Sequence, residues 1–225
     1  MALIKKGVTG MKDILPEEMI IRDYLINIIK KTYGSFGFTS IETPAMEHIE
    51  NLLSKQGGDN EKLIFKVLKR GEKLKLDDVK DENDLVDAGL RYDLTLPLAR
   101  YYSNNQASLP NPFKALQIGN VYRADRPQKG RFRQFTQCDI DILGEASNLA
   151  EIELILATTK ALSEIAKGKK FTVRINDRRI LLAMALFAGY SEENISNVFI
   201  ILDKMDKIGL DGVKKELTEL EGADK

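Results

Sequence analysis

Five basic side chains crowd a short stretch near the middle of this sequence. Residues 122–133 contain one acid, Asp125, and their basic residues are Arg123, Arg126, Lys129, Arg131 and Arg133. A guanidinium group binds phosphate oxygens through paired N–H donors, so such a cluster suits a nucleotide or a nucleic-acid backbone. The alternative is a solvated hairpin tip whose charges only keep the protein soluble.

The residues that follow alternate as the side chains of a strand do, pointing to opposite faces in turn. Over residues 131–143 the even positions suit packing against helices. The odd positions are Arg131, Arg133, Phe135, Gln137, Asp139 and Asp141. This face would carry cationic, aromatic and acidic zones in order, which fits a nucleotide at one end and an ammonium-bearing molecule at the other. Alternation alone describes equally well a strand with one face in water.

A second segment, residues 90–96, shows the same alternation. Its even positions are the apolar residues Leu90, Tyr92, Leu94 and Leu96, and its odd positions are Arg91, Asp93 and Thr95. If the polar faces form a ligand-binding sheet, we expect Asp93 and Thr95 to converge on Gln137 and Asp141.

Helices and strands alternate along the chain without a regular βαβ rhythm. Helices are predicted over 16–33 and 148–166, after Pro97 and after residue 177. Strands are predicted over 38–42, 63–70, 90–96, 113–123, 131–143 and 171–177, with a charged surface excursion over 71–88. Strands 113–123 and 131–143 should form a hairpin with a basic tip. The pattern predicts an α+β fold rather than a doubly wound parallel sheet.

Composition excludes several function classes. Thirty-four basic residues balance 34 acidic ones, so nucleic acid or membrane cannot be bound through excess charge. One cysteine and one histidine exclude an internal disulfide and a Cys/His zinc site, and we expect no metal site. The apolar runs fall short of the roughly 18 residues that span a bilayer, and the start lacks a signal-peptide core. These features predict a cytoplasmic protein without a membrane segment.

Several segments, in order, resemble the histidyl-tRNA synthetases, which are class II aminoacyl-tRNA synthetases. VYRADRPQKGRFRQFTQCDIDILG resembles their motif 2, GVTGMKDILPEE their N-terminal entry, and FGFTSIETPAME their motif 1. LRYDLTLPLARYYS resembles the segment that holds the histidine amino group, and FTVRINDRRIL the stretch that leads into the insertion domain. The resemblance covers essentially the whole chain.

The resemblance implies a class II antiparallel sheet flanked by helices. Residues 1–177 would form a partial catalytic core with motifs 1 and 2, and residues 178–225 the start of a helical insertion domain. The implied activity is that of a histidine–tRNA ligase, which activates histidine with ATP and its Mg²⁺ and charges tRNA(His). It also implies a homodimer whose interface involves residues 36–50.

The resemblance also implies a role for each matching residue. Arg123 would hold the ATP α-phosphate and the amino-acid carboxylate and would be catalytic. Asp125, Arg131 and Phe135 would bind ATP, with Phe135 stacking on adenine. The residues that would bind histidine are Asp93, Thr95, Gln137 and Asp141, and those that would face tRNA are Arg126 and Lys129.

Parts of the family pattern do not occur in this sequence. The motif 3 arginine, the second histidine-binding block and the anticodon-binding domain are missing, so we interpret the chain as an N-terminal fragment that is inactive alone. One alternative is a histidine-sensing regulatory subunit of ATP phosphoribosyltransferase, a synthetase-like paralogue. A generic RNA-binding module fits poorly, because the net charge is zero and one strand face is acidic.

Overall fold

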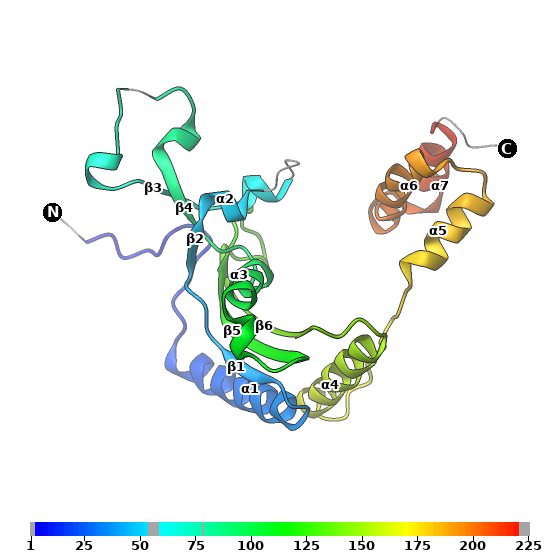
Figure 1. Cartoon of the computed structure of the whole chain (residues 1–225), viewed down its shortest axis with the longest axis horizontal. Coiled ribbons are helices and arrows are strands. Elements are labelled where there is room, and N and C mark those ends of the chain that lie inside the picture. Colours follow the sequence, from blue (N-terminus) through cyan, green and yellow to red (C-terminus); the bar gives the residue numbers. More distant parts are fainter. Residues whose placement is uncertain (1–2, 54–58, 78, 221–225) are drawn as a thin grey trace. The chain divides into compact units, whose positions relative to one another are not determined.

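The computed structural model describes residues 3–53, 59–77 and 79–220 (Figure 1). The chain divides into two compact units, residues 1–170 and residues 171–225. All the candidate site residues lie in the first unit. The division falls before the segment 171–177, whereas the sequence predicted a boundary after it.

The first unit is built on a long antiparallel hairpin. β5 (Phe113–Tyr122) pairs with β6 (Gln134–Leu143) along its whole length, from Phe113 opposite Leu143 to Tyr122 opposite Gln134. β1 (Thr39–Ile41) adds to the other side of β5 in parallel, which gives the order β1-β5-β6. The predicted hairpin is therefore confirmed, although its second strand begins at Gln134 and not at residue 131.

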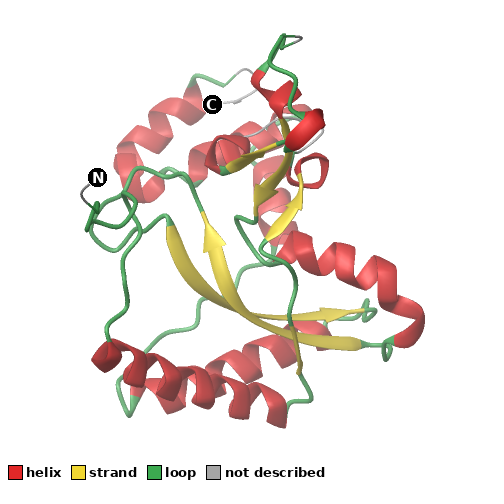
Figure 2. Cartoon of the chain, turned by 90° about the vertical axis from the view of Figure 1, so that its left-hand side faces the viewer, coloured by secondary structure: helices red, strands yellow, loops and turns green. Residues whose placement is uncertain are grey.

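Two helices cover one face of this sheet, α1 (Pro16–Ser35) and α4 (Leu149–Ala166) (Figure 2). Pro16 occupies the first turn of α1, where its missing N–H costs nothing. Ile140 and Ile142 of β6 pack under the helices, against a core of Tyr33, Phe38, Leu116, Ala157 and Ala161. The even positions of β6 therefore face the helices, as the alternation predicts, and the odd positions face the other way.

A second, smaller sheet holds β2 (Met46–His48), β4 (Val86–Leu90) and β3 (Lys66–Leu68) in that order, all antiparallel. The short helix α2 (Ile49–Leu52) packs on it around Ile64 and Val86. Single 3-10 turns occupy 59–63, 71–73, 82–85 and 106–108. The architecture is the predicted α+β fold, rich in antiparallel strands and flanked by helices.

The prediction of a strand over 90–96 is wrong. β4 ends at Leu90, residues 91–94 form a turn, and α3 (Thr95–Asn105) begins before Pro97. The backbone N–H of Leu96 donates to Asp93 Oδ1 at 3.3 Å, so the carboxylate satisfies an N–H of the first turn that has no partner within the helix. Asp93 and Thr95 therefore reach the sheet from a turn and a helix start, not from a strand face.

Two other boundaries differ from prediction. The excursion over 71–88 ends early, because Val86 is buried and starts β4, the central strand of the small sheet. Residue 78 within it lies outside the described residues. The segment 171–177 has strand composition but forms no strand in the structure, because no described segment pairs with its backbone.

The second unit is helical, as predicted. It contains α5 (Arg178–Phe187), a 3-10 turn over 192–194, α6 (Ile195–Leu202) and α7 (Met205–Thr218). Its small core includes Ala185, Ile195 and Val198. Residues 221–225, which the sequence assigns to the same segment, lie outside the described part. Among the helices described in both units, none is long and apolar enough to cross a membrane.

Candidate functional site

Backbone hydrogen bonds from distant parts of the chain fix the base of the basic loop between β5 and β6. The N–H of Ala124 donates to the carbonyl of Leu63 at 2.8 Å, and the N–H of Arg133 donates to the carbonyl of Gly10 at 2.7 Å. Gly10 has φ +82°, and a Cβ there would lie 2.8 Å from Arg133 Cγ. Only glycine fits this close approach without strain, so the N-terminal segment is matched to the loop.

The loop and the start of β6 line a cavity of about 250 Å³. All four predicted ATP residues line it: Arg123, Asp125, Arg131 and Phe135. The guanidinium carbon of Arg123 lies 5.1 Å from the centroid of the Phe135 ring, and its Nε donates to the carbonyl of Tyr92 at 3.0 Å. Asp125 and Arg131 lie 3.5 Å apart as an ion pair. This end of the site offers a cation, an aromatic face and a paired acid, which together suit a nucleotide.

The two residues predicted to contact tRNA do not line this cavity. Arg126 and Lys129 are exposed on the loop beyond it. A Cβ at the neighbouring Gly130 would meet nothing within 4 Å, so the loop tip is open to a large partner.

The other end of the site is acidic. Burial and the charge of Asp93 raise the pKa of Asp141 above its ordinary value. Burial, followed by the charges of Asp141 and Asp93, also raises the pKa of Asp139, while Arg123 opposes the change. Three carboxylates therefore influence one another there, which favours a cationic ligand.

Two buried acceptor atoms at this end have no hydrogen-bond partner among the described residues. They are Gln137 Oε1 and Asp141 Oδ2, both on the β6 face opposite the helices. Buried polar atoms are normally satisfied, and exceptions require an explanation such as a ligand. Asp93 reaches this end from its turn, and Thr95 is exposed at the start of α3.

Sequence reasoning placed Asp139 and Arg133 in the polar row of residues 131–143, and Arg133 in the basic cluster, but gave neither an individual role in the site. Asp139 stands in the odd row of β6 between Gln137 and Asp141, and it is half-buried rather than solvated. Arg133 is not in β6. Its Nε donates to the carbonyl of Asp125 at 3.0 Å, and its guanidinium lies 6.0 Å from the Phe65 ring. Alternation indicates the face on which Asp139 lies, but no local pattern predicts the contacts of Arg133.

Comparison with known proteins assigns the chain to a family. The sequence profile of the family described as histidyl-tRNA synthetase matches residues 10–222. A histidine–tRNA ligase of Leifsonia xyli is 49% identical over 216 residues, which cover 93% of this chain and 49% of that protein. One of Bacteroides fragilis is 41% identical over 219 residues, covering 93% and 48%. The chain thus spans about half the length of these relatives.

Solved structures agree with the sequence comparison. The crystal structure of histidyl-tRNA synthetase from Nostoc sp. PCC 7120 matches 97% of this chain and 46% of that one, with a TM-score of 0.78 and 31% identity. A Bacillus halodurans structure titled as an ATP phosphoribosyltransferase regulatory subunit/histidyl-tRNA synthetase has a TM-score of 0.77 over 99% of this chain and 53% of that one. At 21% identity the second match concerns the fold alone. Together with the class II-like sheet, the profile match and the close relatives show that this chain belongs to the histidyl-tRNA synthetase family.

Proposed function

We propose that the full-length protein is a cytoplasmic histidine–tRNA ligase, to which this chain contributes one half of the catalytic site. The observation that carries the proposal is the pair of unsatisfied buried acceptors, Gln137 Oε1 and Asp141 Oδ2, close to a cavity suited to a nucleotide. An amino acid with a basic side chain supplies donors for the acceptors, and ATP fills the cavity.

Histidine would bind at the acidic end. Its ammonium group would meet Asp93, Thr95 and Gln137, and its imidazole N–H would meet Asp141. Such a ligand donates the hydrogen bonds that Gln137 and Asp141 lack. A positive charge also offsets the repulsion among the carboxylates there.

ATP, accompanied by Mg²⁺, would bind at the other end, with its adenine on Phe135 and near Asp125 and its phosphates on Arg131 and Arg123. One carboxylate oxygen of histidine then attacks the α-phosphorus. A P–O bond forms to histidine as the bond to the leaving pyrophosphate breaks, which gives histidyl adenylate. Arg123 would stabilise the charge that gathers on the α-phosphate, because a positioned guanidinium acts most strongly in the transition state.

In the second step, a hydroxyl of the terminal ribose of tRNA(His) attacks the histidyl carbonyl carbon, and AMP leaves. The exposed Arg126 and Lys129 would hold the acceptor end of the tRNA. Their place at the tip of an anchored loop supports this role, because the base of the loop is fixed while its tip is open.

We also propose a homodimer formed through residues 36–50. β1 and β2 are edge strands of their two sheets, and the chain runs directly from one to the other. Met46 is 55% exposed on this stretch. A second copy related by a two-fold axis would cover Met46 and both strand edges.

Histidine-dependent exchange of labelled pyrophosphate into ATP tests the function. The full-length protein should show exchange, and residues 1–225 alone should show no measurable aminoacylation, because the remaining charge-stabilising groups of the site would be missing. If the intact protein shows no exchange but binds a phosphoribosyltransferase, the regulatory reading replaces this one. The relatives named histidine–tRNA ligase do not favour that reading.

A further inference from the structure

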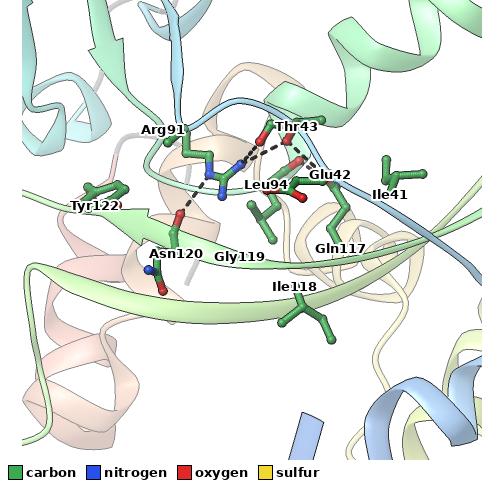
Figure 3. Close-up of a pocket in the computed structure, with 11 residues that line it drawn as sticks. Ile41, Glu42, Thr43, Arg91, Leu94, Gln117, Ile118, Gly119, Asn120 and Tyr122 are labelled. Carbon is green, nitrogen blue, oxygen red and sulfur yellow. Dashed lines mark hydrogen bonds between the residues drawn. The ribbon is translucent and has the colours of Figure 1, made fainter. Parts of the chain in front are cut away.

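A buried arginine lies beside the proposed site without an acidic partner among the described residues. Arg91 is only 7% exposed, and burial lowers the pKa of its guanidinium. All its side-chain hydrogen bonds go to uncharged oxygens. Figure 3 shows those to Thr43, whose carbonyl lies at 2.7 Å and Oγ1 at 3.2 Å, and to the carbonyl of Asn120 at 2.9 Å. A fourth goes to the carbonyl of Pro44 at 3.3 Å. Glu42 and Glu47 favour the charge from a distance but form no ion pair with it, so the cost of burying this guanidinium is offset only in part.

The backbone of Arg91 joins the same segments as its side chain. Its N–H donates to the carbonyl of Ala45 at 3.0 Å, and its carbonyl accepts from the N–H of Tyr122 at 2.9 Å. Arg91 therefore ties the turn after β4 to the segment 43–45 and to β5. This one residue thus connects the turn to two segments that are distant in sequence.

Two residues of β5, Gly119 and Gln117, fit closely around the Arg91 guanidinium and its partner Thr43. A Cβ at Gly119 would lie 2.5 Å from Arg91 Nη2, so a side chain there would displace it. Gln117, also buried, donates from Nε2 to the carbonyl of Leu94 at 3.0 Å and accepts from Thr43 Oγ1 at 3.3 Å. Figure 3 shows both polar side chains reaching toward Thr43.

The turn held in this way carries groups of the proposed site. It contains Asp93, whose charge raises the pKa of Asp141, and the carbonyl of Tyr92, to which Arg123 donates. Three of the four predicted ATP residues, Asp125, Arg131 and Phe135, lie instead on the hairpin and its loop. A shift of the turn would thus displace the acidic end of the site and leave these three in place, and it would reach the nucleotide cavity only through Arg123, which donates to the carbonyl of Tyr92.

We propose that Arg91 is a positioning residue that sets the affinity of this protein for its amino acid by placing Asp93 against Asp141. The proposal rests on the function proposed above. Arg91 acts through the turn and does not itself touch the substrate. Displacing a positioned group by about 1 Å costs up to roughly 10²-fold, so the expected loss is about 10- to 100-fold in the histidine term.

Three variants of the full-length protein test this. Arg91→Lys keeps the positive charge and removes the planar guanidinium with its several N–H donors. Gly119→Ala keeps Arg91 and displaces its guanidinium with the added methyl group. Arg100→Lys is the matched control: Arg100 forms a bidentate ion pair with the buried Glu47, with Nε 2.7 Å from Oε2 and Nη2 2.8 Å from Oε1. Within the described part of the chain, its side chain forms no hydrogen bond or ion pair with residues 91–94. The KM values for histidine and ATP come from pyrophosphate exchange, and the Kd for histidine from calorimetry.

We expect Arg91→Lys to raise both the KM and the Kd for histidine about 10-fold or more and to change the KM for ATP less than about 3-fold. Arg100→Lys should lower the thermal midpoint and leave the histidine values unchanged. Combined with Gly119→Ala, the effect of Arg91→Lys should fall well short of the product of the two single effects, because both act on one guanidinium.

The outcomes separate this inference from the function on which it rests. An unchanged histidine KM and Kd in folded Arg91→Lys, or an equal rise in the histidine and ATP terms, overturns the positioning role. If Arg91→Lys does not fold, Gly119→Ala decides on the same criteria. A wild-type protein that binds histidine without exchange refutes the ligase function, and calorimetry still tests Arg91. If the wild type does neither, both proposals fail.

Discussion

The two ends of the proposed site are built in opposite ways. At the nucleotide end the charged groups already have partners: Asp125 pairs with Arg131, and Arg123 lies over Phe135. At the amino-acid end, Gln137 Oε1 and Asp141 Oδ2 are buried and have no hydrogen-bond partner in the described part of the chain. The first end is formed largely by a loop, and the second by the middle of β6 and a turn held by Arg91.

This difference assigns binding affinity for the nucleotide to one end of the site and discrimination between amino acids to the other. A loop with internally paired charges can bind a nucleotide that is recognised mostly by phosphates and an aromatic face. A buried acceptor without a partner rejects any ligand that cannot donate to it, because the penalty of burial is then unrelieved. We therefore expect the acidic end to select the amino acid and the basic end to supply binding and transition-state charge.

Arg123→Ala should have the largest effect. Its guanidinium is the predicted group for charge that develops on the α-phosphate, so kcat for pyrophosphate exchange should fall about 10²- to 10³-fold. Arg70, exposed just after β3, gives the control variant Arg70→Ala, which should retain exchange. A loss confined to KM would mean that Arg123 binds ground state and transition state equally.

Asp141→Ala should raise the KM for histidine and leave that for ATP nearly unchanged. A hydrogen bond to a charged acceptor contributes about 1.5–3 kcal/mol, or about 10- to 150-fold in affinity. Asp125→Ala serves as the counterpart and should raise the ATP term instead. If Asp141→Ala changes the ATP term and leaves the histidine term alone, the two ends have been assigned the wrong way round.

Phe135→Ala should raise the KM for ATP roughly 10-fold, because stacking of a base on an aromatic ring contributes about 1–3 kcal/mol. Phe135→Tyr retains the aromatic face and should behave as the wild type. Steady-state kinetics at saturating histidine measures both variants. Equal losses in the two would show that ring packing against Arg123, and not stacking on the base, is the function of this position.

The smallest effect concerns stability and pH. The folded-state pKa of Asp141 is raised, so the wild type is stabilised at low pH and loses that stabilisation as the pH rises through the folded pKa. Asp141→Asn removes the buried charge and should be more stable than the wild type at neutral pH by about 1 kcal/mol. The gain should vanish below the ordinary aspartate pKa of about 3.9. Urea unfolding at the two pH values measures it, and a neutral-pH loss contradicts the assigned burial.

The local sequence pattern predicted the hairpin because a ten-residue strand shows the alternation of polar and apolar residues over many positions. Ile140 and Ile142 alternate with Asp139 and Asp141, and only one register buries the first pair under the helices. The helix that begins at Pro16 was predictable for a similar reason, since proline and acids mark a helix start. The residues of the site on β6 followed from these elements.

Tertiary structure decided the rest. Apolar residues at alternate positions made residues 90–96 look like a strand, but the turn is fixed by the hydrogen bonds of Arg91 and by the bond from the N–H of Leu96 to Asp93. Alternation also placed Arg91 on a polar face. In the structure its side chain is buried and donates to carbonyls that are distant in sequence. The pairing of Gly10 with Arg133 joins residues far apart in sequence, and no local rule contains that information.

The outer edge of β6 affects the solubility of the chain while it is being synthesised. Among the described residues β6 pairs only with β5, so its free edge can add strands from other molecules. Charged side chains on an edge strand act as gatekeepers against aggregation, and β6 carries two, Asp139 and Asp141, both partly buried on the face opposite the helices. Neutralising these acids should thus give a chain that unfolds less readily yet precipitates more readily. Selection for solubility during synthesis would retain them even without a ligand.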